Sequence, residues 1–477
     1  KHARGCHFSP QEWFDHNGLP MDRICSLAGQ TGLCPYELSR ALLPYAEIWI
    51  CDYNYVFNPQ NQSVLWEQFD FEPHRSLLIV DEAHNLPERV ADAWSAADSR
   101  QEMEEVVAEL DLLNAPRALC RAARNWLKLL ENLKPAERLD PIIEYDIADS
   151  VKALAEALRD APLPYDELSA FTADKLYAAL RIQRVIERTE IPKLFWCPAP
   201  GRLRISCLEA ASPIMETLKQ FGQSILMSAT LSPTKIYLEQ TGLPGATTPF
   251  IAAEASWRDD AYSVAVDTRV DTRLRTREQH YLKTTQTIAA LIHDTNGPVA
   301  VFFPSYRYAE TIRTYLEAQD SMVRVALQPG AVDLNGQLTF VEESLLAAHV
   351  MFFVLGSNFS ESIDLLGGRV GTTMVVGPAL PEVNALQKAK LEACQSLGQP
   401  EAFRRVYQIP AIRKINQAHG RFVRAPGQRA RVLLHCRRFA EASYANLLSP
   451  EYLNTTLVRN DDAFLAWLQG QHRAGNP

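Results

Sequence analysis

Asp81-Glu82-Ala83-His84 directly follows the aliphatic run from Leu77 to Val80. This run is too short for a helix and lacks polar alternation, which is typical of a strand buried on both faces of a parallel sheet. Carboxylates at the end of such a strand can hold Mg²⁺ and orient an attacking water. The pattern therefore predicts a nucleotide hydrolysis site in which Asp81 holds Mg²⁺ and Glu82 is the second carboxylate. An acidic surface loop is the alternative.

A second candidate site is the arginine-containing segment Gln417 to Arg424, which reads QAHGRFVR. Arginines spaced in this way can reach across a cleft and stabilise charge that develops on a γ-phosphate. Arg421 and Arg424 are three residues apart, so they would share a face if the segment is helical. Arginines that bind DNA phosphates, or that only cover the surface, are the alternative.

Nine cysteines without other signs of an extracellular chain indicate reduced, buried or metal-bound thiols rather than disulfides. Cys6, Cys25 and Cys34 lie close together near the N-terminus among Gly and Pro residues, which favours a small metal-stapled insert. Cys51 and the remaining cysteines lie among apolar residues, where cysteine usually acts as a small core hydrophobe.

The elements that would position these residues are short apolar runs alternating with helical stretches. This alternation predicts an α/β architecture whose functional residues gather at the C-terminal ends of the strands. The predicted strands are Ile48–Cys51, Leu77–Val80, Ser224–Met227, Val299–Phe303, Val350–Leu355, Thr373–Val376 and Val432–Leu434. The predicted helices include Pro35–Leu43, Tyr308–Gln319 and Glu382–Leu397.

The residue pattern changes from about Pro87 to Ile191, where apolar residues recur at helical spacing among many charged residues and no strand-like run occurs. This pattern predicts an α-helical insertion that splits one α/β domain. A second boundary is expected between Pro244 and Trp257, after which strands and helices alternate again.

Composition is that of a globular protein with two or three domains, and no apolar run approaches the roughly 20 residues that span a membrane. The net charge is −9, but residues 401–477 hold twelve Lys and Arg against five Asp and Glu. This basic region suits a phosphate-binding surface, although a solvated face is the plainer reading. The first residue is Lys1, and we expect it to be a cut within a longer chain.

Five segments resemble the conserved motifs II to VI of superfamily 2 DNA helicases, in the form used by the XPD/DinG group. They occur in the order that the family requires, each beside an expected strand. The segments are LIVDEAHNL (Leu78–Leu86), Ser228-Ala229-Thr230-Leu231-Ser232-Pro233, Phe302-Phe303-Pro304-Ser305-Tyr306, Gly356-Ser357-Asn358-Phe359-Ser360-Glu361-Ser362-Ile363-Asp364, and Gln417–Arg424.

The resemblance implies two RecA-like parallel-sheet motor domains, the first incomplete, with an iron–sulfur insert remnant and an α-helical Arch insert. On this basis, residues 1–44 end the iron–sulfur insert, 45–86 and 191–244 form motor domain 1, 87–190 form the Arch, and 252–477 form motor domain 2. It also implies that ATP and Mg²⁺ bind between the motors. The implied ATP-site residues are Asp81, Glu82, His84, Ser228, Thr230, Glu361, Asp364, Gln417, Gly420, Arg421 and Arg424.

Cys34-Pro35-Tyr36, with Arg40 and then Cys51-Asp52-Tyr53, resembles the end of the family's iron–sulfur insert. The resemblance implies that Cys34 is the last ligand of a [4Fe–4S] cluster, with Cys6 and Cys25 as further candidates. A cubane cluster takes four thiolates, so a fourth ligand is expected upstream. Tyr36 and Arg40 are then expected to contact single-stranded DNA, as are Ser305 and Tyr306 of motif IV.

Several family features are missing or altered. No G-x-x-x-x-G-K-[ST] phosphate-binding loop occurs in the 477 residues, so the chain by itself is expected neither to bind ATP tightly nor to unwind DNA. Ser362 stands where motif V usually has Gly, and Gln428 and His435 stand near positions where the family commonly has Asp. We interpret these three as divergence rather than loss of activity.

The resemblance thus implies an ATP-dependent DNA helicase that moves 5′-to-3′ on single-stranded DNA in repair or replication. Single-stranded or forked DNA is the expected partner, and we expect a cytoplasmic monomer away from membranes, nucleoid-associated if the protein is prokaryotic. One alternative is a degenerate helicase-like scaffold that binds DNA without ATPase activity. Another is a nucleic-acid-binding iron–sulfur module fused to a further activity such as a nuclease, although no nuclease carboxylate cluster is present.

Overall fold

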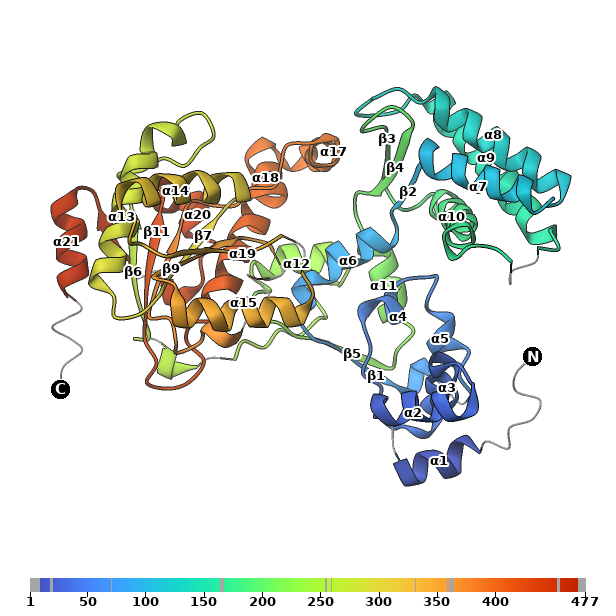
Figure 1. Cartoon of the computed structure of the whole chain (residues 1–477), viewed down its shortest axis with the longest axis horizontal. Helices are drawn as coiled ribbons and strands as arrows, with labels where there is room; N and C mark the ends of the chain where they lie inside the picture. Colours follow the sequence, from blue (N-terminus) through green and yellow to red (C-terminus); the bar gives the residue numbers. More distant parts are fainter. Residues whose placement is uncertain are drawn as a thin grey trace. The chain divides into compact units, whose positions relative to one another are not determined.

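The computed structural model describes residues 9–17, 20–69, 71–163, 167–253, 255–258, 260–330, 332–357, 359, 364–452 and 455–470. The chain divides into two compact units (Figure 1). Unit 1 comprises Lys1–Thr248 and Asn384–Ala389, and unit 2 comprises Pro249–Val383 and Lys390–Pro477. Cys6, Glu361 and Ser362 lie outside the described residues, and the side chain of Asp364 is not described either.

Unit 1 begins with three helices that pack together through Ile24, Ala28, Leu38 and Leu42. They are α1 (Pro10–Asn17), α2 (Met21–Thr31) and α3 (Pro35–Leu42). The following part, which carries the DEAH tetrad, contains α4 (Tyr53–Phe57), α5 (Ser63–Trp66), β1 (Leu77–Val80), α6 (Leu86–Ala93), α11 (Ala211–Leu218), β5 (Gln223–Leu226) and α12 (Thr234–Thr241).

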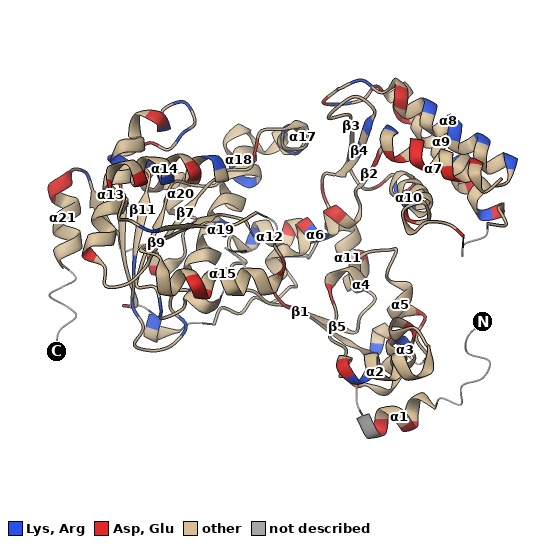
Figure 2. Cartoon of the chain, in the orientation of Figure 1, with Lys and Arg blue, Asp and Glu red and all other residues tan. Residues whose placement is uncertain are grey.

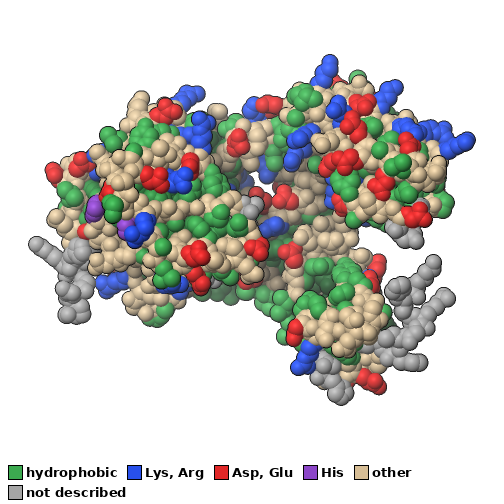
Figure 3. Space-filling model, in the orientation of Figure 1, with side chains coloured by type: hydrophobic (Ala, Val, Ile, Leu, Met, Phe, Trp, Pro, Cys, Tyr) green, Lys and Arg blue, Asp and Glu red, His purple; other side chains and the backbone are tan. Residues whose placement is uncertain are grey.

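β1 and β5 form a two-stranded parallel sheet in the register Leu77 to Gln223 and Val80 to Leu226. One face of this sheet packs on the core, whereas Leu77 and Ile79 on the other face are exposed. Figure 3 shows hydrophobic side chains gathered over this part of unit 1. Strands β1 and β5 confirm the predicted Leu77–Val80 and, within one residue, Ser224–Met227.

The predicted strand Ile48–Cys51 is wrong. These residues have no regular secondary structure and pair with no described strand, and the Ile50 side chain is 96% exposed. Cys51 is also exposed and so is not the core residue that was expected. Strand formation requires a hydrogen-bonding neighbour, which an apolar run cannot provide for itself.

The inserted region is not purely helical as predicted. It contains α7 (Arg100–Leu112), α8 (Arg117–Asn132), α9 (Pro141–Asp160) and α10 (Ala170–Glu187), and also a three-stranded antiparallel sheet. In that sheet β4 (Arg202–Cys207) is central, between β2 (Ala96–Ser99) and β3 (Lys193–Trp196). One strand of this sheet, β2, lies within residues 87–190, and the other two strands follow residue 190.

Unit 2 is built on a seven-stranded parallel sheet with the order β12-β6-β11-β10-β7-β9-β8. The strands are β6 (Tyr262–Asp267), β7 (Val299–Phe303), β8 (Val325–Leu327), β9 (Val350–Val354), β10 (Thr372–Val375), β11 (Ala430–His435) and β12 (Thr455–Val458). The helices include α13 (Tyr281–Asp294), α14 (Tyr306–Gln319), α15 (Leu334–Ala347), α18 (Gln399–Phe403), α19 (Ile409–His419), α20 (Ala442–Ala445) and α21 (Asp461–Gly470). Helix α17 (Ala385–Ala393) is divided between the two units at Ala389. This α/β architecture confirms the predicted fold class.

Alternate residues of the central strands face opposite layers of unit 2. Val301 and Phe303 of β7 pack with α13, α14 and α21. Phe302 lies on the other side, against His419 and Phe422 at the end of α19. Both faces of the sheet are therefore covered, which explains why its central strands are continuous apolar runs.

The basic residues of positions 401–477 do not form one uninterrupted surface. Several are paired within unit 2: Arg405 with Glu401, Arg431 with Asp294, and Arg437 with Asp271. Figure 2 shows acidic and basic segments interleaved over this unit. Among the described residues, no helix has the length and hydropathy needed to cross a membrane.

Candidate functional site

The DEAH tetrad forms a tight turn at the C-terminal end of β1. The adjacent strand holds this turn, because Met227 N–H donates to Val80 O at 2.9 Å and Ala83 N–H donates to Met227 O at 3.0 Å. Glu82 has a φ of 47°, in the left-handed region that non-glycine residues rarely adopt. The surrounding contacts must therefore stabilise this conformation.

His84 joins the DEAH turn to the Ser228-Ala229-Thr230 segment. His84 Nδ1 lies 2.7 Å from Ser228 Oγ and 3.3 Å from Glu82 Oε2. Ser228 Oγ also lies 3.5 Å from Glu82 Oε2. Ser228 thus meets Glu82 and His84, although it lies more than 140 positions away in the sequence. These contacts join the DEAH turn to the loop after β5.

Two tyrosines that the sequence interpretation missed hold the carbonyls on either side of Glu82. The Tyr53 hydroxyl donates to Asp81 O, and the Tyr237 hydroxyl donates to Ala83 O at 2.9 Å. Burial, together with the charges of Asp81 and Glu82, raises the pKa of Tyr53 to about 12, so this phenol stays protonated as a donor. Of the two, only Tyr53 was part of a recognised motif, Cys51-Asp52-Tyr53; nothing in the sequence marked Tyr237.

Asp81 and Glu82 are both exposed at the strand end. A carboxylate pair of this kind fits Mg²⁺, which takes oxygen ligands and usually keeps several waters. No group of three or more His, Cys, Asp or Glu side chains suited to a metal occurs in the described part of the chain. Asp81 would therefore hold the ion with water and nucleotide oxygens as the remaining ligands.

Thr230 lies in the same loop, where its N–H donates to Ser228 Oγ at 3.2 Å. Its own hydroxyl is buried and has no hydrogen-bond partner among the described residues. The structure therefore brings together Asp81, Glu82, His84, Ser228 and Thr230.

Arg421 and Arg424 would share a helical face only if their segment were helical, and it is not, because α19 ends at His419. Both arginines lie in the irregular segment that follows, Arg421 half-buried and Arg424 exposed. Gly420 ends the helix, and its carbonyl accepts a hydrogen bond from Arg258 at 3.3 Å. Gln417 lies half-buried on the last turns of α19.

Gln428, at one of the altered family positions, stabilises this irregular segment. Its Oε1 accepts the backbone N–H groups of Arg424 at 2.7 Å and Ala425 at 3.1 Å. A carboxylate could accept the same two donors, so Gln428 preserves the shape of the loop that carries Arg424.

His419 was not singled out from the sequence, although it lies within QAHGR. Its ring is fully buried against Phe302, Phe422 and Tyr452. Neither ring nitrogen has a hydrogen-bond partner in the described part of the chain. Burial lowers the pKa of His419 to about 3, so the ring is neutral at physiological pH.

Ser305 and Tyr306 lie at the C-terminal end of β7, where motif IV was predicted. Ser305 caps α14 by accepting Tyr308 N–H at 3.4 Å. The Tyr306 ring is partly exposed, while its hydroxyl donates to Pro329 O at 2.7 Å and accepts from Gln328 Nε2 at 2.5 Å. Ser305 therefore has a structural partner, and the exposed face of Tyr306 is the part able to meet a ligand.

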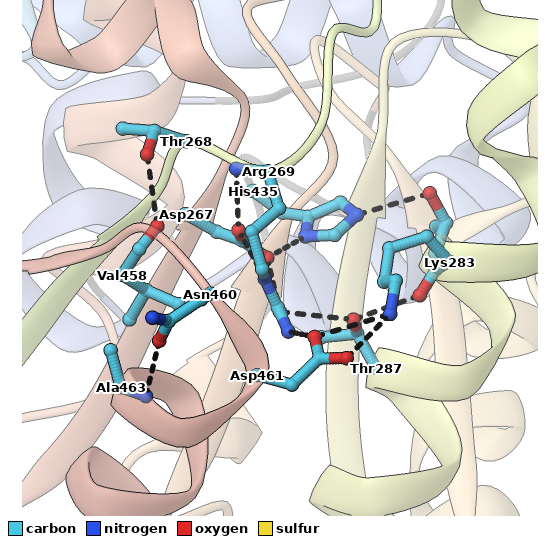
Figure 4. A network of polar contacts seen from close by, with 11 residues as sticks. Asp267, Thr268, Arg269, Lys283, Thr287, His435, Val458, Asn460, Asp461 and Ala463 are labelled. Carbon is cyan, nitrogen blue, oxygen red and sulfur yellow. Dashed lines mark hydrogen bonds and ion pairs between the residues drawn. The ribbon is translucent and has the colours of Figure 1, made fainter.

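His435, the other altered position, belongs to a buried network in unit 2 (Figure 4). His435 Nδ1 lies 2.8 Å from Asp267 Oδ2, and its Nε2 lies 3.0 Å from Thr284 Oγ1. Arg269 forms two side-chain hydrogen bonds to the same Asp267. The side chains of Asp267, His435 and Thr284 are all buried. This Asp-His-Thr arrangement therefore has no access for a substrate and stabilises the fold.

The electrostatics of Asp267 follow from these contacts. Burial by itself raises the pKa of this carboxyl, but hydrogen bonds from Arg269 and the charge of His435 outweigh burial and hold the pKa well below its usual range. Asp267 is therefore a buried carboxylate that depends on its two partners.

Cys25 lies on α2 and Cys34 immediately precedes α3, and both thiols are exposed. By contrast, Cys120, Cys197, Cys207 and Cys436 are buried. An iron–sulfur cluster takes four cysteine ligands, and in this part of the described chain Cys25 and Cys34 are exposed thiols on segments that pack together. Cys6 lies outside the described residues.

Tyr36 and Arg40 are brought together on α3. Arg40 lies 5.9 Å from the centre of the Tyr36 ring and forms long ion pairs with Glu37 and Glu67, at 3.7 and 3.9 Å. The Tyr36 ring is partly exposed. Stacking of a base on Tyr36 is compatible with this geometry, whereas Arg40 would have to exchange acidic partners for a phosphate.

Comparisons with known proteins agree with the order of these elements. The family described as DEAD_2 matches residues 6–103, and the Helicase C-terminal domain family matches residues 288–454. Together the two matches cover more than half of the chain.

Among curated proteins, the ATP-dependent DNA helicase CHL1 of Yarrowia lipolytica is 19% identical over 90% of this chain and 63% of its own length. The regulator of telomere elongation helicase 1 homolog of Caenorhabditis briggsae is 22% identical over 93% of this chain and 56% of its own length. For CHL1 of Candida albicans, this chain covers 60% of that protein's length. The chain thus spans roughly 60% of the length of such relatives.

Among solved structures, one titled XPD_Helicase matches with a TM-score of 0.63 and 16% identity, over 91% of this chain and 77% of that one. Xpd4 of S. tokodaii matches with a TM-score of 0.59 and 17% identity, over 92% of this chain and 88% of that one. These matches show that the fold is shared. With its five motifs in order, two family matches and this fold, the chain belongs to the XPD/DinG type of superfamily 2 helicases.

Proposed function

We propose that the whole protein is an ATP-dependent DNA helicase that moves 5′-to-3′ on single-stranded DNA during genome maintenance. In this proposal Asp81 holds Mg²⁺, Glu82 orients the attacking water, and Arg421 and Arg424 stabilise charge on the transferred phosphate. Gln417, Gly420, Glu361 and Asp364 complete the ATP site.

The observation that carries the proposal is the contact of His84 with both Ser228 and Glu82. A motor must connect hydrolysis at one place to movement at another. Here one buried imidazole contacts the carboxylate next to the Mg²⁺ position and the hydroxyl of motif III, and this contact supports a role in coupling.

The 477 residues contain no phosphate-binding loop of the G-x-x-x-x-G-K-[ST] type. We therefore propose that they bind DNA but do not hydrolyse ATP by themselves, and that the ATPase of the whole protein depends on such a loop elsewhere. A whole protein that lacks the loop would be the degenerate DNA-binding scaffold instead.

The test compares ATP hydrolysis by the whole protein with and without single-stranded DNA. Glu82→Gln should lower kcat by about 10²-fold or more, since a positioned acid or base contributes about 10²–10⁴-fold. Glu88→Gln is the matched control, because Glu88 is exposed on α6 and has no ion-pair partner among the described residues. Equal activity of the wild type and Glu82→Gln would reject the ATPase proposal.

The direction of movement requires a separate measurement. Strand displacement should occur on a duplex with a 5′ single-stranded tail and be absent on one with a 3′ tail. The reverse preference would contradict the proposed polarity while leaving the ATPase proposal intact.

We further propose that Cys34 and Cys25, with Cys6, ligate a [4Fe–4S] cluster. When bound, the cluster would staple the three N-terminal helices, with Tyr36 and Arg40 beside it. Two exposed thiols on packed helices support this proposal.

Iron analysis and visible absorbance of anaerobically purified whole protein test the cluster. Cys34→Ser should lose iron, whereas Cys51→Ser, which removes another exposed thiol, should keep it. An iron-free wild type, or an unchanged iron content in Cys34→Ser, would contradict the assignment.

A further inference from the structure

Gln328 is a buried amide that contacts two of the helicase motifs at once. It follows the edge strand β8, and only 2% of its surface is exposed. Its Oε1 accepts Val354 N–H at 2.8 Å and, where motif V begins, shares the hydrogen of the Ser357 hydroxyl, at 3.1 Å, with Val354 O, at 2.6 Å. Its Nε2 donates to the Tyr306 hydroxyl of motif IV at 2.5 Å.

The backbone beside Gln328 completes this arrangement. Gln328 N–H donates to Phe352 O at 3.0 Å, which continues the pairing of β8 with β9. The Tyr306 hydroxyl passes its own hydrogen to Pro329 O at 2.7 Å. The amide and the phenol are therefore fixed in one direction of donation, from Gln328 to Tyr306 and from Tyr306 to Pro329.

No other side chain type of this size reproduces these contacts. A glutamine offers an acceptor that can take two donors and an NH₂ group that can donate to a hydroxyl. Glutamate would lose the donor, and methionine would lose both polar groups. Since a buried donor or acceptor without a partner is costly, the network allows one arrangement of the two motifs and opposes others.

The three elements joined by Gln328 are neighbours in the sheet. Strand β9 pairs with β7 on one side and with β8 on the other, all parallel. Tyr306, Ser357 and Gln328 therefore follow the C-terminal ends of three adjacent strands, where ligands bind in α/β sheets. The partly exposed ring of Tyr306 is the part of this group that can meet a base.

We propose that Gln328 is a positioning residue that couples motif IV to motif V, so that the placement of the Tyr306 ring and the backbone at Val354 to Ser357 change together. This inference rests on the proposed function, because it assumes that Tyr306 contacts single-stranded DNA.

Hydrogen exchange of the 477-residue chain tests the coupling without DNA or ATP. Gln328→Met should speed exchange at the Val354 amide by about fivefold, the effect of losing one ordinary hydrogen bond. Tyr306→Phe, which does not touch Val354, should also speed exchange there, because it removes the partner that holds the Gln328 amide. No change at Val354 in Tyr306→Phe would overturn the inference.

Binding of labelled oligo(dT) to the same variants gives the second readout. Gln328→Met and Tyr306→Phe should each weaken binding by about threefold to tenfold, and the double variant should be no weaker than the weaker single variant. Multiplicative losses would overturn the coupling. A wild-type chain that does not bind oligo(dT) would instead reject the proposed function, while the exchange result at Val354 still decides the coupling.

Gln337→Met is the matched control. Gln337 is also buried in unit 2, on α15, and donates to Val332 O at 3.1 Å, but it forms no hydrogen bond with either motif in the described residues. Gln337→Met should leave both the exchange rate of the Val354 amide and the affinity for oligo(dT) unchanged. If it changes them as much as Gln328→Met does, both variants destabilise unit 2 in general and the inference is wrong.

Discussion

His435 Nδ1 lies 2.8 Å from Asp267 Oδ2, and both side chains are fully buried in unit 2. The two residues sit on the neighbouring parallel strands β11 and β6, paired directly in register. The histidine near a position where the family commonly has Asp is therefore matched by a carboxylate on the adjacent strand. This pairing explains how His435 is accommodated without an unpaired polar group in the core.

The first prediction concerns the carboxylate of that pair. Asp267→Asn takes the buried charge partner from the nearly buried Arg269, which keeps its ion pair with the exposed Asp461, and removing one member of a buried ion pair costs about 3–5 kcal/mol. Thermal or urea unfolding of unit 2 should show this loss. Asp461→Asn is the control, because Asp461 is 64% exposed and also pairs with Arg269, so its loss should cost about 1 kcal/mol or less.

A second prediction concerns acid sensitivity at His419. Burial lowers its pKa to about 3, while the unfolded chain titrates near the ordinary histidine value of about 6.5. Because the pKa of His419 is lower in the folded state, its neutral ring contributes fully to the free energy of unfolding above about pH 6.5. This contribution declines as the pH falls towards 3, since the unfolded chain binds a proton that the folded chain does not. His419→Leu should flatten the fall in the free energy of unfolding of unit 2 between pH 6.5 and pH 4.5, whereas an unchanged slope would contradict the prediction.

The third prediction has the opposite sign and lies in unit 1. Burial raises the pKa of Asp98 to about 6, although hydrogen bonds from the Trp126 indole and Ser99 N–H oppose the shift. Because the pKa of Asp98 is higher in the folded state, the contribution of its protonated carboxyl to the free energy of unfolding is complete below about pH 4. This contribution is lost as the pH rises through 6. Asp98→Asn should remove the loss of unit 1 stability between pH 4 and pH 7, as followed by denaturant unfolding.

The fourth prediction concerns the tyrosines around Glu82. Tyr237→Phe leaves the buried Ala83 carbonyl without its 2.9 Å donor and should cost about 1–3 kcal/mol in unit 1. Hydrogen exchange of residues 79–86 should rise in Tyr237→Phe and in Tyr53→Phe. Tyr55→Phe, on the same short helix as Tyr53, should leave that exchange unchanged, because its hydroxyl has no partner among the residues that the structure describes.

Several strands were predictable because their signal is local. Val299–Phe303 and Leu77–Val80 are both continuous apolar runs. The first is buried on both faces, as such runs usually are, whereas one face of Leu77–Val80 is exposed among the described residues. Edge strands were missed: β8 has three residues and β12 is partly polar, and each depends on pairing with a neighbour. The same dependence explains why Ile48–Cys51 looked like a strand and is not one.

The antiparallel sheet of the insert was missed for a related reason. β2 reads AADS, with no apolar run, and becomes a strand only through pairing with β4, more than a hundred residues away. The irregular course of Arg421 to Arg424 was likewise decided outside the segment, because the Gln428 side chain holds the backbone that follows α19.

The identity of the motor family, the order of its motifs and the strand ends that carry Asp81, Ser228 and Tyr306 could all be read from residue types and short spacings. The sequence could not show that His84 contacts Ser228, that Gln328 holds Tyr306 and Val354, or that His435 faces Asp267. These contacts join residues at least 22 positions apart. The type of a side chain determines which hydrogen bonds it is able to make. Only the packing of the sheets decides which donor and acceptor come within 3 Å of each other.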